Sequence, residues 1–250
     1  MPAFLETYSI ISLVGVALAA FVTSTVHGAT GVAGGFLLSA ALAPIIGVAP
    51  IVPVVSISLL VSHTARALLN LGDFHMRAFW LVSVPAVPLI AFMASIYGKM
   101  SSSLIALVLG CVILASIPLR RWAKSRQIQT SAPALAGIGG VYGALSGVSI
   151  GPGMLLVPFL LGFGLTKEQF VATLAVIALL TNVTRVSVFG ATDLLSFDFM
   201  LIGLLCGLMT IPGNWIGRTV LRRMTTESHS GLVDVLTILG ALNFFWLSLR

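Results

Sequence analysis

The sequence predicts an all-α polytopic membrane protein of about ten apolar segments, arranged as two inverted repeats of five segments each. Three observations predict this fold: an apolar composition, a series of long apolar runs and a similarity between the two halves. Hydrophobic residues make up 58% of the 250 residues and charged residues 8%, whereas about 25% of residues in soluble proteins are charged. The mean hydropathy is +1.11, so we expect the chain to span a bilayer.

The apolar runs divide the chain into ten segments. Repeat 1 is residues 1–119 and is predicted to hold the segments 5–27, 32–46, 50–71, 77–97 and 102–119. A basic linker, 120–131, follows. Repeat 2 is residues 132–250, with the segments 132–149, 153–164, 168–190, 197–217 and 230–249. Most segments approach the ~20 residues that a helix needs to cross a ~30 Å hydrocarbon core.

Three stretches of the first half recur in the same order in the second half. Residues 31–38 resemble residues 147–156, residues 62–66 resemble residues 181–185, and residues 96–99 resemble residues 215–218. The last two pairs have the same offset along the chain. An internal similarity of this kind indicates two copies of one structural unit.

The second segment of each repeat is short. As helices, 32–46 and 153–164 would reach only about 22 and 18 Å, so they either re-enter on the same side or cross with the help of unwound backbone. Basic residues favour the cytoplasmic side of a membrane, and they decide between the two. If every segment crosses, the cytoplasmic side collects Arg77, Arg120, Arg121, Lys124, Arg126, Lys167, Arg218, Arg222 and Arg223, against Lys99 and Arg250 outside.

With re-entrant segments the basic residues would divide about evenly, so we expect ten crossings, a cytoplasmic linker and both termini outside. An odd number of crossings per repeat inverts one repeat relative to the other. Inverted repeats with short, glycine- or proline-interrupted segments are typical of secondary transporters, whose site lies between the repeats near mid-membrane.

Small residues cluster around the start of both short segments: Thr30, Gly31, Gly34 and Gly35 at the first break, and Gly147, Ser149, Gly151 and Gly153 at the second. Glycine lets a ligand approach the backbone closely, and the unpaired N–H groups at a helix N-terminus attract anions. The repeated clusters therefore predict an anion site. The alternative is close helix packing through small residues.

Polar side chains inside apolar runs are the second set of candidates. Arg66 and Arg185 are repeat counterparts, and His63 and Asn182 precede them by one helical turn. Intramembrane arginines often mark a transport pathway, and we expect these two to attract the anion from opposite sides. A snorkelling arginine and an interhelical hydrogen bond are the simpler alternatives. His27 ends the first segment, opposite Tyr142 in the second repeat, and is a candidate for proton coupling or for plain packing.

Several functions are excluded by what the sequence lacks. No acidic residue lies convincingly at mid-membrane, which argues against cation transport. There is no Walker A motif, no metal-ligand cluster and no Ser/His/Asp constellation, so we expect no enzyme, no cofactor and no metal. The net charge of +6 reflects membrane orientation and not nucleic acid binding. Cys111 and Cys206 are predicted to be buried packing residues.

The two glycine-rich breaks carry a resemblance to a known family. Residues 34–38 run on to Pro44, residues 151–157 run on to Pro158, and each is followed by a small-residue helix and a short turn, Gly72-Asp73 or 190–193. This pattern resembles the TauE/SafE family of sulfite and organosulfonate membrane transporters, also described as the 4-toluene sulfonate uptake permease family, over nearly the whole chain. The matching glycines are Gly31, Gly34, Gly35, Gly147, Gly151 and Gly153.

The resemblance implies transport of a small organosulfur anion, often as export. Our leading hypothesis is a secondary transporter in the inner membrane whose partners are a small anionic substrate and the lipid bilayer. A carrier of another small anion, such as a carboxylate, and a non-transporting membrane scaffold are the alternatives, and a homo-oligomer is left open.

Overall fold

The computed structural model describes residues 9–30, 34–126, 129–221 and 226–249. Within these ranges there are α-helices, one short 3-10 helix and no strand. The elements are α2 (Ile10–Thr30), α3 (Gly34–Ile46), α4 (Ile51–Asn70), η1 (Leu71–Asp73), α5 (Met76–Tyr97), α6 (Ser102–Arg126), α7 (Ala132–Val148), α8 (Gly153–Gly162), α9 (Lys167–Ala191), α10 (Phe197–Leu221) and α11 (Thr226–Ser248).

The all-α prediction is confirmed, and each predicted segment corresponds to one helix. Several helices run further than expected, among them α6 and α2. α6 continues through Arg126, into the predicted linker, because this basic stretch contains neither glycine nor proline and consists largely of good helix formers. α2 continues through Gly28 to Thr30, so the first break begins later than the sequence suggested.

Polar caps and glycines set several helix ends. The side chains of Ser131 and Thr166 accept hydrogen bonds from backbone N–H groups in the first turns of α7 and α9, and Gln169 completes a capping box at Thr166. α3 and α8 are followed by Gly47 and Gly164, whose φ angles are +81° and +99°. Glycine adopts this left-handed region without a steric cost, so the chain can turn sharply after each short helix.

Among the described residues, six helices are long and apolar enough to cross a membrane: α2, α4, α5, α6, α9 and α10. α3, α7 and α8 are shorter apolar helices, and α11 contributes the apolar stretch Thr237–Ser248. α3 and α8 have 13 and 10 residues and extend about 20 and 15 Å, less than the ~30 Å hydrocarbon core. The chain is a multi-pass membrane protein with two short helices at corresponding places in its halves.

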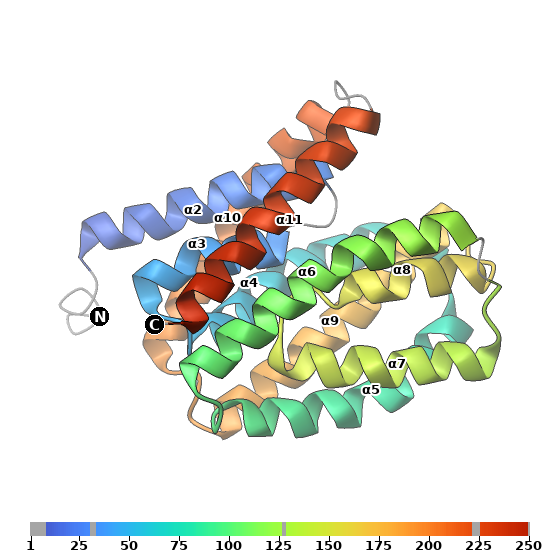
Figure 1. Ribbon diagram of the computed structural model, residues 1–250, viewed down its shortest axis with the longest axis horizontal. Helices are drawn as coiled ribbons and strands as arrows, with labels where there is room; N and C mark the ends of the chain where they lie inside the picture. The colour runs from blue at the N-terminus through green and yellow to red at the C-terminus, as the bar shows by residue number, and fades with distance from the viewer. Residues whose placement is uncertain (1–8, 31–33, 127–128, 222–225, 250) are drawn as a thin grey trace.

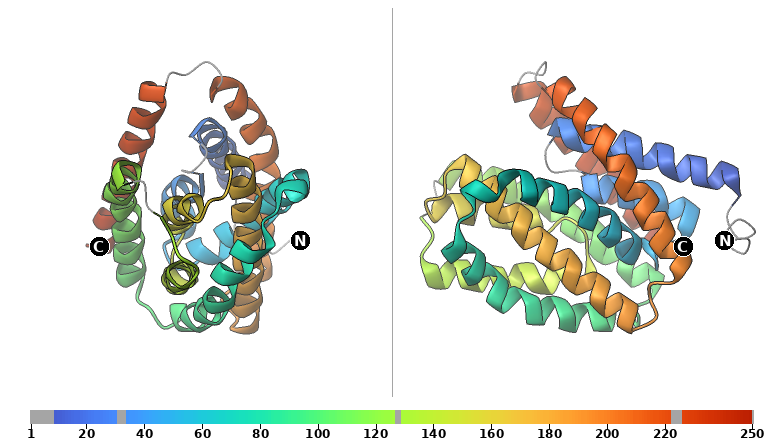
Figure 2. Two further views of the ribbon diagram at one scale, coloured as in Figure 1. Left: turned by 90° about the vertical axis from the view of Figure 1, so that its right-hand side faces the viewer. Right: turned by 180° about the vertical axis from the view of Figure 1, so that it is seen from behind.

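The helix pairs that pack together correspond between the two halves. α2 packs along α10 as α7 packs along α5, and α4 contacts α10 as α9 contacts α5. The short helices follow the same pattern, since α3 contacts α2, α4 and α11 while α8 contacts α7, α9 and α6. α5 and α7 run side by side along one edge of the bundle, and α2 begins at the end of the bundle where α11 ends (Figure 1). The views in Figure 2 show the short helices among the longer ones.

Glycines bring α7 unusually close to α5. A Cβ added to Gly139 would lie 2.6 Å from the carbonyl oxygen of Val82, and one added to Gly143 would lie 2.5 Å from that of Ala86. Gly147, one turn further on, lies against Met93 and the α5 backbone. These three glycines serve close helix packing.

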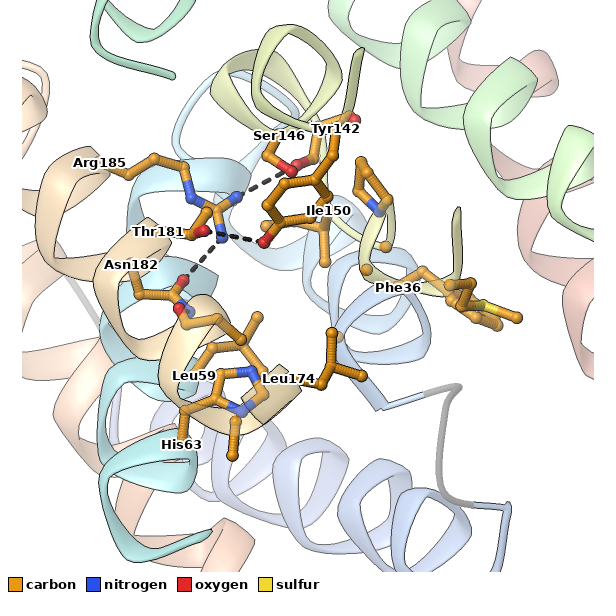
Figure 3. Close-up of a pocket in the computed structure, with 18 of the residues that line it drawn as sticks. Phe36, Leu59, His63, Tyr142, Ser146, Ile150, Leu174, Thr181, Asn182 and Arg185 are labelled. Carbon is orange, nitrogen blue, oxygen red and sulfur yellow. Dashed lines mark hydrogen bonds between the residues drawn. The ribbon is translucent and has the colours of Figure 1, made fainter. Parts of the chain in front are cut away.

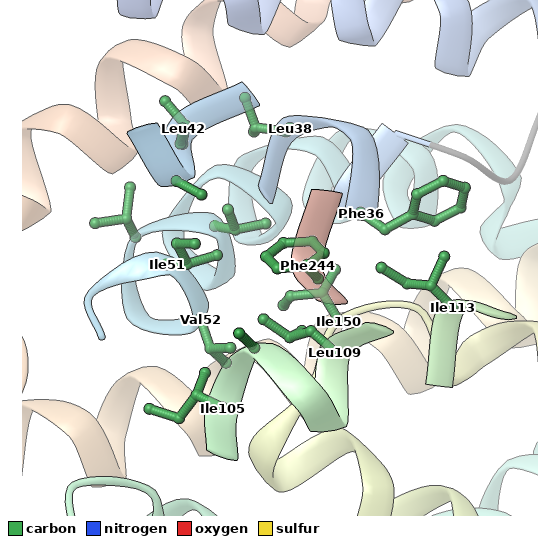
Figure 4. Packing of buried hydrophobic residues seen from close by; sticks show 14 of the residues in the cluster. Phe36, Leu38, Leu42, Ile51, Val52, Ile105, Leu109, Ile113, Ile150 and Phe244 are labelled. Atoms are coloured by element: carbon green, nitrogen blue, oxygen red, sulfur yellow. The ribbon is translucent and has the colours of Figure 1, made fainter. Parts of the chain in front are cut away.

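Apolar side chains from both halves form the main core. Phe36, Leu38 and Leu42 of α3 meet Ile105, Leu109 and Ile113 of α6 and Phe244 of α11 (Figure 4). Ile150, from the break before α8, belongs to the same cluster. The core therefore holds the two glycine breaks next to each other. The predicted burial is correct for Cys206 but wrong for Cys111, which is exposed because it lies on an outward face of α6.

Candidate functional site

A cavity lies where the two glycine breaks meet, and it is lined by residues of both halves (Figure 3). Its volume is about 110 Å³. A cavity needs about 10–15 Å³ to hold one water, so this one has room for several waters or for a small anion. Its lining residues are His27, Gly35, Phe36, Leu59, His63, Arg66, Tyr142, Ser146, Ser149, Ile150, Gly151, Pro152, Gly153, Met154, Val157, Leu174, Ala175, Ala178, Thr181, Asn182 and Arg185.

Arg185 of α9 is the buried charge of the cavity, with 4% of its surface exposed. One terminal nitrogen donates to the carbonyl oxygen of Ser149 at 3.1 Å, and the other donates to Oδ1 of Asn182 at 2.7 Å. The amide nitrogen of Asn182 in turn donates to a carbonyl of its own helix at 2.7 Å. These bonds fix the guanidinium between α9 and the second glycine break.

The charge of Arg185 has no carboxylate partner in the described part of the chain. None of the residues that line the cavity is acidic, and Nε of Arg185 is buried without a hydrogen-bond acceptor among the described residues. Burying an uncompensated charge costs several kcal/mol. An anion in the cavity would offset much of this cost, so the arrangement favours binding of an anion.

Tyr142 of α7 and Thr181 of α9 form a hydroxyl pair at the same wall, 2.8 Å apart. Thr181 donates its only hydroxyl proton to the carbonyl oxygen of Ile177 at 2.9 Å. Tyr142 must therefore be the donor to Thr181. The pair joins α7 to α9 beside the guanidinium of Arg185 (Figure 3).

His63 and Arg66 reach the cavity from α4. His63 forms no hydrogen bond with any described residue, and its Nδ1 is fully buried without a partner. Leaving a buried polar atom unsatisfied costs about 1–3 kcal/mol. The imidazole is therefore a group that a ligand in the cavity can satisfy.

His27, at the end of α2, is tied to the start of α3. Its Nδ1 accepts a hydrogen bond from the N–H of Gly34 at 3.0 Å, and the imidazole ring occupies the space that a Cβ on Gly34 would need. At Gly35 an added Cβ would lie 2.7 Å from Cγ2 of Ile150. The first break is thus packed tightly, and the N–H of Gly34 is already used within the protein.

The second break offers an N–H group that no described residue accepts. Gly151 has φ of +109°, which favours glycine, and its carbonyl oxygen accepts from Met154 N–H at 3.2 Å. Gly153 is the first residue of α8 and lines the cavity. Its N–H has no acceptor among the described residues, and a Cβ added to it would meet nothing within 4 Å.

The comparison with protein families is decisive for classification. The family model described as "Sulfite exporter TauE/SafE" matches residues 16–244, nearly the whole chain. The chain belongs to the TauE/SafE family. A comparison with curated proteins gives no significant match, and neither does one with solved structures. This TauE/SafE protein is therefore related to membrane transporters of the sulfite exporter type.

Most of the residues singled out in this TauE/SafE sequence lie together. Nine of them line the cavity: His27, Gly35, His63, Arg66, Ser149, Gly151, Gly153, Asn182 and Arg185. Gly34 contacts His27 beside it, and Gly147 lies in the α5–α7 contact outside the lining. Thr30 is the last residue of α2, and Gly31 lies outside the described residues. Arg66 and Arg185, expected toward opposite sides, line the same cavity.

Sequence reasoning did not select three polar residues of the cavity, Tyr142, Ser146 and Thr181. A signal was present for two of them, because Tyr142 is the repeat counterpart of His27 and Thr181 immediately precedes Asn182. The apolar lining residues Phe36, Leu59, Met154, Val157 and Leu174 had no such signal, since apolar residues are found throughout the chain.

Proposed function

We propose that this TauE/SafE protein is a secondary transporter that carries a small organosulfur anion, such as sulfite or a sulfonate, out of the cell across the inner membrane. The observation that carries the proposal is the buried guanidinium of Arg185, which has no carboxylate partner among the described residues and faces a small cavity between the two halves. Membership of the family supports the choice of an organosulfur anion.

The lining of the cavity suits an oxyanion that carries a small apolar substituent. Arg185 and Asn182 form a polar wall, and the free N–H of Gly153 lies on the same lining. Phe36 and Leu174 lie away from the guanidinium, toward the other side of the cavity (Figure 3). The proposed binding mode places the oxygen atoms against the polar wall and the substituent against the apolar one.

Alternating access requires the two halves to move against each other around this cavity. Two features support inverted repeats: the packed helix pairs correspond between the halves, and α2 begins at the same end of the bundle at which α11 ends (Figure 1). The proposed motion rocks one repeat against the other, so that the cavity opens to each side in turn. Accessibility of a cysteine introduced at residue 123 tests the orientation. Labelling by an impermeant reagent from the cytoplasmic side only is expected.

The function is tested by flux in reconstituted vesicles. Wild-type protein is expected to move radiolabelled sulfite or methanesulfonate, and Arg185→Met is expected to move little. Arg77→Met is the matched control, because Arg77 lies exposed at the start of α5, outside the cavity. Loss of a buried charged partner costs about 2–5 kcal/mol of binding. Absence of flux for both anions, or equal flux in wild type and Arg185→Met, would refute the proposal.

The same assay separates the alternatives. A carboxylate carrier would show stronger competition from acetate than from methanesulfonate. A membrane scaffold would show no flux of either anion.

A further inference from the structure

The cavity contains a titratable side chain, His63, to which the proposed function assigns no role. His63 forms no hydrogen bond with any described residue, and its Nδ1 is buried. The titratable or charged groups around the cavity are Arg66 on the same helix, His27 on α2, Arg185 on α9 and Tyr142 on α7. The short helices α3 and α8 contribute only glycine and apolar residues to the cavity lining. Pro152 lies in the turn that precedes α8.

The charges in the cavity disfavour a proton on His63 while the cavity is empty. Two guanidinium groups line it, and no acidic residue is among the lining side chains. A third positive charge would be repelled by both arginines, and in a poorly solvated site this repulsion is only weakly screened. His63 without a ligand is therefore expected to be neutral.

An anion in the cavity reverses the balance. Its negative charge attracts a proton to His63, and a protonated imidazole has N–H donors at both ring nitrogens. The coupling is reciprocal: the anion binds more tightly when His63 is protonated, and His63 takes up a proton more readily when the anion is bound. The anion and the proton thus enter and leave the cavity together.

We propose that His63 carries a proton across the membrane together with the anion. The inference rests on the proposed function and adds the coupling ion to it. The proton is taken from water on the side to which the cavity is open, is held on an imidazole nitrogen, and returns to water on the other side as the anion leaves. For a monovalent sulfonate, one proton per anion makes the cycle electroneutral, so the membrane potential neither drives nor opposes it, and export follows the outward gradient of the anion.

His27, the proton-coupling candidate from the sequence, is less suited to this task. Its Nδ1 already accepts a hydrogen bond from Gly34 N–H at the start of α3, and a proton on that nitrogen would remove the bond. His63 has no bond of this kind to lose. Its repeat counterpart is Asn182, which cannot titrate. His63→Asn therefore replaces the titratable ring with the residue that the other repeat uses at this position.

The test measures protons and anions in the same vesicles. Methanesulfonate is the probe because it stays ionised near neutral pH and cannot carry the proton itself. Wild-type protein is expected to acidify a dye-loaded lumen by about one proton for each methanesulfonate that enters, at a rate unaffected by an imposed potassium diffusion potential. His63→Asn is expected to lose the acidification. His75→Asn is the control, because asparagine can also cap α5 and His75 lies outside the cavity lining.

Each possible result of this experiment either supports or overturns the role of His63 in proton transport. Anion entry that carries charge without protons in the wild type overturns the inference and leaves the proposed function intact. Equal coupling in wild type and His63→Asn overturns it as well. If only radiolabelled sulfite is moved, the ratio of protons to sulfite must fall in His63→Asn, and an unchanged ratio counts against His63. If neither anion moves, the proposed function fails.

Discussion

Replacing Gly153 by alanine is expected to weaken anion binding without destabilising the protein. Gly153 is the first residue of α8, and an added Cβ would meet nothing within 4 Å, so the methyl group projects into open space at the cavity. Its N–H has no acceptor among the described residues. If the anion accepts a hydrogen bond there, obstruction of that bond costs about 1.5–3 kcal/mol, which is about a 10- to 150-fold loss of affinity.

The assay is inhibition of sulfite flux by methanesulfonate in vesicles, together with thermal unfolding in detergent. Alanine is the better helix former, by up to about 1 kcal/mol, so the free energy of unfolding should be unchanged or slightly raised. Gly137→Ala is the matched control, since Gly137 is exposed on α7 and an added Cβ there also meets nothing within 4 Å. Unchanged affinity in Gly153→Ala would refute the view that this N–H binds the anion.

Three further outcomes follow from the packing. Gly143→Ala should lower the free energy of unfolding by about 1–3 kcal/mol, because its Cβ would meet the α5 backbone; unchanged thermal unfolding would contradict this contact. Tyr97→Phe removes a part-buried 2.9 Å hydrogen bond to a backbone carbonyl, so we expect about 1 kcal/mol less stability with unchanged flux. A membrane-permeant maleimide should label Cys111, which is exposed, before Cys206, which is buried; the reverse order by mass spectrometry would contradict the packing of α6 and α10.

The sequence was sufficient to predict the helices and the two breaks, because the signals for both are local. Apolar runs, polar caps such as Thr166 and glycines such as Gly151 determine where a helix can begin or end. The exception is also local in origin. The first segment was expected to end at residue 27, but the glycine that follows, Gly28, weakens a helix by only about 1 kcal/mol, and α2 continues through it to Thr30.

The sequence was less informative about the structural role of each glycine and polar residue, because that role depends on contacts with residues distant along the chain. Gly34 and Gly153 look equivalent in the sequence, yet the N–H of Gly34 is bonded to His27 while that of Gly153 has no described acceptor. The contact between Tyr142 and Thr181 joins two helices, and no local sequence pattern predicts it. Repeat alignment selected positions that line the cavity but could not show which atoms meet.

The differences between the repeats bear most directly on mechanism. If the halves exchange conformations during transport, counterpart residues should exchange environments. Arg185 now donates to Ser149 in the second break and to Asn182 beside it. Its counterpart Arg66 is preceded by His63 and not by asparagine, so the equivalent contacts in the opposite state cannot be chemically identical. The two states of the transport cycle would then differ in one respect: histidine lies next to the engaged arginine in one state, and asparagine in the other. Only histidine can change its charge, so the proposed proton coupling is expected in the state in which Arg66, with His63 beside it, engages the anion.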